Sequence, residues 1–228
     1  MEYCCFKTGK GEYGEGDIFL GIKVPEQRKI ANKYKNLLLS YIQQLLSSKI
    51  HEYRLIGLFI LIYHYNRTNN KMSEMQSISE HVQKSSISDK QIINFYLKNI
   101  KNINNWDLVD LSAPNILGDY FLDKPKRVLY KLARSKNIWE KRIAIMATFT
   151  FIRNNKFEDA LRISEISLKD KHDLIHKAAG WMLREIGKRD LETEERFLKK
   201  HSNYMPRTML RYAIEKFPEN KRRFYLKK

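Results

Sequence analysis

Apolar residues recur at helical spacing along almost the whole chain, and this pattern constrains the fold more than any other feature. The segment that begins at Pro25 has one apolar helical face, and residues 51–65 are apolar almost all round, as in a buried helix. No segment shows the alternation of a strand, and the 228 residues include only 9 Gly and 5 Pro. The sequence therefore predicts an all-α fold with a sizeable core.

The pattern also places the helix boundaries. We expect the first helical segment to break near Ser40, and residues 66–89, rich in Asn, Ser, Lys and Met, to form a loop or a marginal helix. Later helices are expected over residues 90–100, 105–121, 125–134, 138–153, 157–168, 172–187, 191–201 and 206–217. Candidate N-cap or first-turn residues are Asp89, Asn105, Asn137 and Thr193.

Charged residues at matching helical positions indicate an internal repeat. Arg142, Lys177 and Arg211 each lie early in an apolar helix, at separations of 35 and 34 residues. A step of 32 residues back from Arg142 reaches Asp110, and Arg54 is an earlier member if a long insertion follows it. Chance spacing among many Lys and Arg is the alternative.

Helix pairs repeated at a period of roughly 35–45 residues are typical of an α-solenoid. One pair cannot bury its apolar face alone, so neighbouring pairs stack and leave a long concave surface. The sequence thus predicts a HEAT-like α-solenoid of stacked antiparallel helix pairs, as a single domain over residues 1–228. Its concave groove would be basic and would hold one carboxylate, Asp110.

The chain is strongly basic, with 43 Lys and Arg against 26 Asp and Glu and a net charge of +17. Residues 124–142 alone hold eight basic residues and one acidic residue. Such an excess suggests nucleic acid or an anionic membrane surface, although a solvated helix face gives the same run. We expect double-stranded DNA as the partner, contacted by Arg54, Lys141, Lys177, Arg184, Arg207 and Arg211.

The cysteines and the N-terminal residues bear on the compartment. Cys4 and Cys5 are adjacent, which suits neither a disulfide framework nor a metal site. No signal peptide is visible, and the longest apolar stretch, residues 55–63, is too short to span a bilayer. We predict a soluble, cytoplasmic, DNA-associated monomer without a membrane partner.

An acidic–aromatic pair is the strongest candidate for chemistry. Trp106 and Asp110 are four residues apart, so on a helix they stand on the same face. An indole beside a carboxylate makes a poor surface and a costly core, but it receives a flat or cationic group well. The simpler interpretation is a core tryptophan and a surface aspartate. On a basic protein, the pair favours DNA that carries a cationic, damaged base.

Two further tryptophans stand beside cations. Trp181 lies one turn beyond Lys177, behind small residues that allow close helix packing or room for a guest. Trp139 lies three residues before Arg142, on the same helical face. Indoles that alternate with cations suit stacking on sugars and bases together with neutralisation of phosphates.

Three other motifs are weaker. His172 and His176 have the i, i+4 spacing of a metal site, but without a third ligand we expect a helix-start or phosphate role and no metal. The glycines within residues 11–16 resemble a phosphate loop only superficially, because acidic residues lie among them, and we expect a structured turn. The basic residues within 221–228 are expected to form a solvated tail or a loose DNA contact.

Several blocks, in order along nearly the whole chain, resemble one protein family. They are FKTGKGEYGEGD at 6–17, FLGI at 19–22, NNWDLVD at 104–110, WEKRIA at 139–144, HDLIHK at 172–177, GWMLRE at 180–185 and MPRTMLR at 205–211. These blocks are similar to those of the DNA alkylation repair family of HEAT-like, AlkD-type DNA glycosylases.

The resemblance implies a monofunctional DNA glycosylase of base excision repair, a hydrolase that releases N3- and N7-alkylated purines from duplex DNA. Such an enzyme would not need to extrude the base, and no metal or organic cofactor is implied. Asp110 matches the family's catalytic carboxylate. Trp106 and Trp181 match two aromatic walls around the deoxyribose of the lesion, and Arg142 matches a cation that holds the nearby phosphate.

Two other functions fit a basic helical groove. A non-catalytic HEAT-like module would bind branched or distorted DNA and would have no need of Trp106, Asp110 and Trp181. A protein-interaction scaffold would not need a net charge of +17. Members of the family usually carry a further helix before the first block, and because only residues 1–5 precede it here, we expect that helix to be absent.

Overall fold

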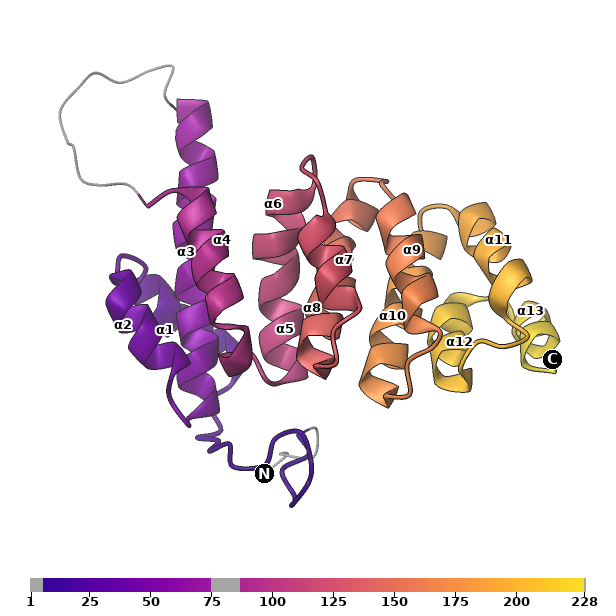
Figure 1. The fold of residues 1–228 in the computed structure, drawn as a ribbon, viewed down its shortest axis with the longest axis horizontal. Coiled ribbons are helices and arrows are strands. Elements are labelled where there is room, and N and C mark those ends of the chain that lie inside the picture. The colour runs from indigo at the N-terminus through magenta and orange to yellow at the C-terminus, as the bar shows by residue number, and fades with distance from the viewer. Residues whose placement is uncertain (1–5, 75–86, 228) are drawn as a thin grey trace. The chain divides into compact units, whose positions relative to one another are not determined.

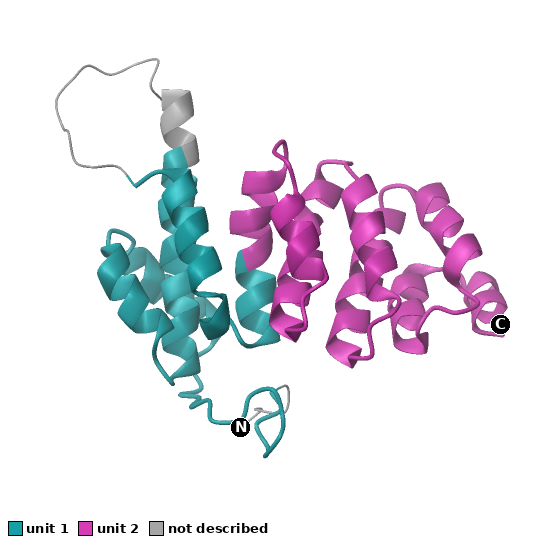
Figure 2. Ribbon diagram, viewed as in Figure 1, with its two compact units in different colours: residues 1–112 teal, residues 113–228 magenta. Residues whose placement is uncertain are grey.

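Residues 6–74 and 87–227 are described by the computed structural model, and most of them are helical (Figure 1). Extended pairing within these residues is limited to an isolated bridge between Ile18 and Ile50. The chain divides into two compact units, unit 1 over residues 1–112 and unit 2 over residues 113–228 (Figure 2). Among the helices of the described residues, none combines the length and the apolarity that a membrane span needs.

Unit 1 is organised around one long helix. Its elements are α1 (Val24–Lys33), α2 (Leu39–Leu46), α3 (His51–Glu74), α4 (Asp89–Lys98), the 3-10 turn η1 (Ile100–Asn102) and most of α5 (Trp106–Ala113). Helices α1, α2 and α4 all pack against α3. Leu58, Ile60 and Leu61 of α3 are fully buried, which confirms the prediction of a buried helix over residues 51–65.

Unit 2 contains a row of stacked helices. Its elements are the π-helical turn η2 (Pro114–Gly118), α6 (Asp119–Phe121), α7 (Arg127–Ala133), α8 (Ile138–Arg153), α9 (Glu158–Ser167), α10 (Asp173–Gly187), α11 (Leu191–His201), α12 (Arg207–Ala213), the 3-10 turn η3 (Ile214–Lys216) and α13 (Glu219–Leu226). Helix α10 packs against both α8 and α12, while α7 packs on α8, α9 on both α8 and α10, and α11 on α10 (Figure 1). This stacking of helix pairs confirms the prediction of an all-α, solenoid-like fold.

The predicted repeat has a structural basis in the helices. Arg142, Lys177 and Arg211 are each the fifth residue of their helix, in α8, α10 and α12. Asp110 is likewise the fifth residue of α5, and Arg54 is the fourth residue of α3. The spacing of these charges therefore follows the length of the helix pairs.

Helices α10 and α12 approach each other at Gly180. A Cβ at this position would overlap the carbonyl oxygen of Met209 and would lie 2.6 Å from the Cβ of Tyr212. Ala178 and Ala179 are fully buried beside it. Of the two uses predicted for these small residues, the structure therefore shows close helix packing.

The helix predicted over residues 105–121 changes its geometry at Pro114. α5, η2 and α6 follow one another without a loop, and η2 is a π-helical turn. Proline has no N–H to donate to an α-helical ladder, which accounts for the wider turn. The Thr150 hydroxyl donates a hydrogen bond of 2.7 Å to the Pro114 carbonyl, and a Cβ on Gly118 would lie 2.7 Å from the same hydroxyl oxygen.

The predicted break near Ser40 is confirmed, and the start of the segment 66–89, predicted as a loop or a marginal helix, is helical. The break in the first helical segment precedes Ser40, because Leu38 is extended at φ −65° and ψ 152° and α2 begins directly after it. The His64 ring lies 2.9 Å from the Leu37 carbonyl oxygen and ties this break to α3. Helix α3 also continues to Glu74, so the first part of segment 66–89 is helical, whereas residues 75–86 lie outside the described part.

The C-terminal basic segment is a helix, and the prediction of a solvated tail is wrong. Tyr225 of α13 is only 4% exposed, and Arg207 donates a hydrogen bond of 2.8 Å to the Leu226 carbonyl. Lys221 pairs with Glu195 of α11. The buried tyrosine and these two contacts hold the segment against the rest of unit 2.

Helix starts agree with the polar residues that the sequence marked. Asn137 caps α8 by accepting hydrogen bonds from the backbone N–H groups of residues 139 and 140. Asp89 and Thr193 occupy first turns, because the caps themselves are Ser88, in a capping box with Gln91, and Asp190.

Candidate functional site

Trp106 and Asp110 belong to the accessible side of α5. Both residues are partly exposed, whereas Asp107, Leu108 and Val109 between them are buried. Because α5 is helical over Trp106–Ala113, the two side chains lie one turn apart, as predicted. An accessible indole and carboxylate on one helical face can together receive a flat cationic group.

The start of α5 is fixed by polar contacts. The side-chain oxygen of Asn105 accepts a hydrogen bond of 2.8 Å from the Trp106 N–H, and Asp107 Oδ1 accepts one of 2.8 Å from the Leu108 N–H. Asp107 Oδ2 lies 2.7 Å from Nε2 of His51, at the start of α3. The carboxylate of Asp107 is thus bound within the protein, which leaves Asp110 as the partly exposed carboxylate of this turn.

A buried hydrogen bond joins α5 to α4. The hydroxyl of Tyr96, which is fully buried, lies 2.9 Å from Oγ of Ser112, and Ser112 donates to the Leu108 carbonyl at 2.5 Å. Burial raises the pKa of the Tyr96 hydroxyl, and the negative charge of Asp110 raises it further. The position of Asp110 on α5 is therefore tied to a rigid, buried contact.

An aromatic layer packs on one face of the Trp106 indole. The Phe6 ring stacks on the Trp106 indole, with centroids 5.4 Å apart and an interplanar angle of 20°. Phe6 also stacks on Phe19 at 4.8 Å, and Phe19 stacks on the His51 imidazole at 4.7 Å. The N-terminal segment of the protein therefore contributes directly to the surroundings of Trp106.

Four charged side chains are buried beneath this layer. Asp17, His51, Arg54 and Asp107 have side chains between 3% and 9% exposed. The Arg54 guanidinium binds Asp17 Oδ2 at 2.6 Å, and His51 Nδ1 lies 3.9 Å from the same oxygen. We call these four residues the His51 network.

The network shifts the pKa values of two of its members. Burial alone would lower the pKa of the His51 imidazole, but the carboxylates of Asp107 and Asp17 outweigh burial and raise it above the ordinary value. Burial alone would raise the pKa of Asp17, but His51 and Arg54 outweigh burial and lower it. Both shifts favour the charged forms.

The predicted tryptophan and arginine of unit 2 lie on α10 and α8. Trp181 is partly exposed and donates a hydrogen bond of 3.1 Å from Nε1 to Glu185. Arg142 is 5% exposed and donates to the Leu174 carbonyl at 2.6 Å, while Trp139 is 8% exposed. The wall formed by Trp181 and the phosphate contact of Arg142 stay predictions.

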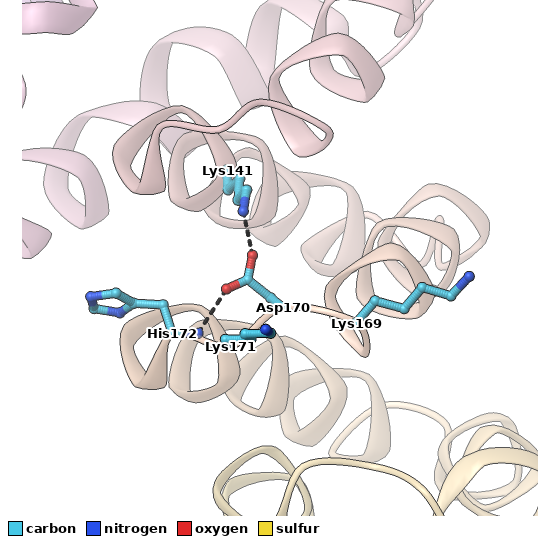
Figure 3. A pocket seen from close by; sticks show the side chains of 5 residues that line it. All are labelled: Lys141, Lys169, Asp170, Lys171 and His172. Atoms are coloured by element: carbon cyan, nitrogen blue, oxygen red, sulfur yellow. Dashed lines mark hydrogen bonds and ion pairs between the residues drawn. The ribbon is translucent and has the colours of Figure 1, made fainter.

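Lys141 lines a shallow pocket between the start of α8 and the loop before α10. Its Nζ lies 2.5 Å from Oδ2 of Asp170, whose other oxygen accepts a hydrogen bond of 2.8 Å from the His172 N–H (Figure 3). Lys169 and Lys171 also line this pocket, which is open and mostly basic. The lysines make the pocket attractive to an anion, whereas Asp170 neutralises part of their charge.

The other predicted DNA-binding cations differ in their surroundings. Arg54 is buried against Asp17, so its charge is used within the protein, and we leave it out of the interface proposed below. Lys177 pairs with Asp173 at 2.7 Å, and Arg184 pairs with Glu215. Arg207, which is bonded to a backbone carbonyl, and Arg211 are exposed.

The weaker motifs are mainly structural. His172 caps α10 by accepting a hydrogen bond from the backbone N–H of residue 174, and the His176 ring lies 2.8 Å from the Asp170 carbonyl. Within the described residues, no cluster of potential ligands could hold a metal ion. The predicted turn over residues 11–16 is confirmed, with Gly11 and Gly16 at positive φ.

Of the His51 network, sequence reasoning singled out only Arg54, as a DNA contact, and it singled out neither Phe6 nor Phe19 of the aromatic layer. Asp107 stands beside Trp106, and Phe6, Asp17 and Phe19 belong to the first two blocks that carry the family resemblance. His51 opens a helix with a buried, charged first turn. The sequence thus contained signals at these positions, but it could not show that their side chains lie together near Trp106, because their contacts span as many as 56 residues.

The fold is that of an all-α, solenoid-like protein, and the accessible Trp106–Asp110 pair is its candidate site for a cationic group. The family model described as "DNA alkylation repair enzyme" matches residues 5–217, so the chain belongs to the DNA alkylation repair family. This match confirms the resemblance seen in the sequence blocks.

A solved structure described as a predicted DNA alkylation repair enzyme from Enterococcus faecalis has a similar fold. The two chains share 15% identity with a TM-score of 0.65, and the match covers 91% of this chain and 92% of the other. At this identity the likeness concerns the fold. No curated protein matches the chain.

Proposed function

We propose that the protein is a monofunctional DNA glycosylase that hydrolyses the N-glycosidic bond of cationic N3- and N7-alkylated purines in duplex DNA. Membership of the DNA alkylation repair family supports a role in alkylation repair. The observation that carries the proposal is the accessible face of α5, where Trp106 and Asp110 are partly exposed while Asp107 is bound to His51.

The chemistry needs only one carboxylate. Alkylation at N3 or N7 gives the purine a positive charge, so the base leaves without protonation by a general acid. The sugar then acquires oxocarbenium character, and a nearby carboxylate stabilises this charge and orients the attacking water. Asp110 would supply that carboxylate, whereas ordinary glycoside hydrolysis uses two.

Selection of a cationic lesion would come from the same residues. An indole attracts a cation over its face by roughly 0.5–2 kcal/mol, so Trp106 would favour an alkylated purine nucleotide over a neutral one. Trp181 would form a second wall beside the deoxyribose, and Arg142 would hold a phosphate. Exposed cations such as Arg211 would contribute the non-specific attraction to the DNA backbone.

Base release from methylated duplex DNA tests the proposal. We expect the wild-type protein to release 7-methylguanine or 3-methyladenine, and Asp110→Asn to lower the rate by about 100- to 1000-fold, since the fixed charge is lost. DNA affinity should be unchanged, because the substitution removes no cation. Asp123→Asn, which removes another exposed carboxylate, is the matched control and should release base at the wild-type rate.

The alternatives predict different results. Full activity of Asp110→Asn would remove this carboxylate from the mechanism. Tight DNA binding by the wild type without base release would favour a non-catalytic module for branched or distorted DNA. Failure to bind DNA at moderate salt would favour a protein-interaction scaffold.

A further inference from the structure

We infer that His51 is a positioning residue that joins the N-terminal segment to α5 and thereby sets the orientation of Trp106 and the position of Asp110. The inference rests on the proposed function for the roles of those two side chains. His51 would act through the groups that it contacts, which are the carboxylate of Asp107 and the rings of Phe6 and Phe19.

The first line of support is connectivity. His51 binds Asp107, one residue after Trp106, at 2.7 Å, and its ring contacts Phe19 at 4.7 Å and Phe6 at 5.2 Å. Phe6 in turn stacks on Trp106. One imidazole therefore contacts both the Asp107 carboxylate of α5 and the Phe6 ring that stacks on the indole.

The charges buried around His51 also favour its protonated form. Two carboxylates, Asp17 and Asp107, and one guanidinium, Arg54, are buried around the imidazole. Glu52, the next residue on α3, is buried as well, so three carboxylates face Arg54 in this part of unit 1, and a protonated His51 offsets more of their charge than a neutral imidazole does. Because an unbalanced buried charge is costly, the imidazolium is the form that the packing favours.

Hydrogen bonds that do not involve the rings of Phe6 and Phe19 also anchor the N-terminal segment on α3. Glu52, the neighbour of His51 on α3, accepts hydrogen bonds of 2.9 Å from the Leu20 N–H and 2.8 Å from the Gly21 N–H. The backbone N–H of His51 also donates to the Ile18 carbonyl at 2.8 Å. Residues 18–21 are thus held at the first turn of α3, which places Phe19 on the His51 ring and against Phe6, the ring that stacks on Trp106.

A networked imidazolium gives orientation more than it gives stability. Buried ion pairs contribute little net stability, but the arrangement of their hydrogen bonds is specific. In a site where a displacement of about 1 Å costs on the order of 100-fold in rate, such a fixed arrangement matters for catalysis. Loss of the proton on His51 would weaken its bond to Asp107 and its attraction to Asp17, and would loosen the link to α5.

The test compares His51→Asn with a matched control on the same helix. His64 of α3 also contacts an adjoining segment, at the Leu37 carbonyl, so His64→Asn is the same substitution away from Trp106. Base release from methylated duplex DNA gives kcat and KM. In parallel, Trp139→Phe with Trp181→Phe leaves Trp106 as the sole tryptophan of the three, and its emission reports on its surroundings.

We expect His51→Asn to lower kcat by roughly 10- to 100-fold with little change in KM, and to shift the emission of Trp106 to longer wavelength. His64→Asn should change neither. In the protein that retains His51, kcat and Trp106 emission should change together as pH rises through the pKa of the imidazole. His51→Asn should abolish this shared transition.

Phe6→Leu keeps the test decisive if His51→Asn does not fold, because it removes the ring over Trp106 and leaves the His51 network intact. It should also lower kcat and shift the emission. Unchanged kcat and emission in the folded variants would overturn the inference, as would a loss of stability alone. If the wild type releases no base, the proposed function fails, and the emission of Trp106 still decides whether His51 positions it.

Discussion

Unit 1 buries charged side chains in a network of ion pairs, whereas unit 2 brings helix backbones together at glycines. In unit 1, Asp17, His51, Arg54 and Asp107 meet beneath the aromatic layer. In unit 2, a Cβ on Gly180 would overlap the backbone of α12. Directional charge contacts fix the orientation of particular side chains, while glycine contacts fix the distance between helices. Trp106 and Asp110, the residues of α5 proposed for chemistry, therefore lie in the unit whose packing fixes the orientation of side chains.

The largest effect on stability should come from Glu194 of α11, a carboxylate that is buried in unit 2 rather than in unit 1. One carboxylate oxygen of Glu194 has no hydrogen-bond partner among the described residues, and burial raises its pKa to about 8. The folded protein then keeps a proton that the unfolded chain, with a pKa near 4.5, releases. The free energy of unfolding should fall by up to about 1.4 kcal/mol for each pH unit between these values.

Glu194→Gln should remove this decline, because the amide does not ionise. Urea unfolding of both proteins, repeated at intervals of about one pH unit between pH 5 and pH 8, measures how the free energy of unfolding changes with pH. Glu192→Gln changes an exposed carboxylate on the same helix and should keep the wild-type slope. An identical slope in Glu194→Gln and the wild type would show that Glu194 does not carry the pH dependence.

The second prediction sets Gly180 of unit 2 against Gly57 of unit 1. Gly180→Ala should lower the free energy of unfolding by about 3 kcal/mol, since the added methyl group would strike backbone. A Cβ on Gly57 would lie 3.2 Å from the Cβ of Leu45, a tight contact with a side chain rather than with backbone. Gly57→Ala should therefore stay within about 1 kcal/mol of the wild type, helped by the higher helix propensity of Ala.

Denaturant unfolding of the two variants decides whether close backbone approach matters more in unit 2. Equal losses of unfolding free energy would break the comparison. A larger loss in Gly57→Ala would reverse it, and would show that unit 1 depends on backbone approach as well.

The third prediction separates two arginines at the same helical position. Arg142→Met removes the buried guanidinium that donates to the Leu174 carbonyl and should lower the free energy of unfolding by about 2 kcal/mol. Arg211→Met, at an exposed position, should change it by less than about 0.5 kcal/mol. Similar losses of unfolding free energy in the two variants would mean that the arginine at the fifth position has the same structural role in α8 and in α12.

The smallest effect concerns DNA binding by Arg211. If this exposed side chain contacts a phosphate, Arg211→Gln should reduce the salt dependence of DNA affinity by about one counterion and weaken binding to all sequences alike. Fluorescence anisotropy over a range of salt concentrations measures the slope. Glu192→Gln serves again as a variant with an altered charge at an exposed site, and an unaltered slope in Arg211→Gln would remove this residue from the interface.

Local periodicity predicted the order and type of the helices, including the position at which Arg142, Lys177 and Arg211 recur. It did not predict the π-helical turn, although the proline that accounts for it is a local feature, and it left residues 66–74 open between a loop and a marginal helix. The run of Lys and Arg in α13 suggested a tail, since the single buried Tyr225 gives too weak a periodic signal.

The candidate site was only partly predictable as well. The spacing of Trp106 and Asp110 placed them on one helical face, which the structure confirms. The same reasoning assigned Arg54 to a DNA surface, because spacing gives no information about Asp17, which binds it across 37 residues. A charge in a repeat is therefore predictable in position, while its environment depends on long-range packing.

The contact at Gly118 has a consequence for how sequences of this family can change. Its lack of a side chain gives room to the Ala147 carbonyl and to the Thr150 hydroxyl, which donates to the Pro114 carbonyl. A larger residue at 118 would strike the backbone of α8 as well as Thr150, so it can be inherited only together with a shift of α8. Among relatives, we expect Gly118 to be retained wherever the contact between Pro114 and Thr150 is retained, although 36 residues separate those two along the chain.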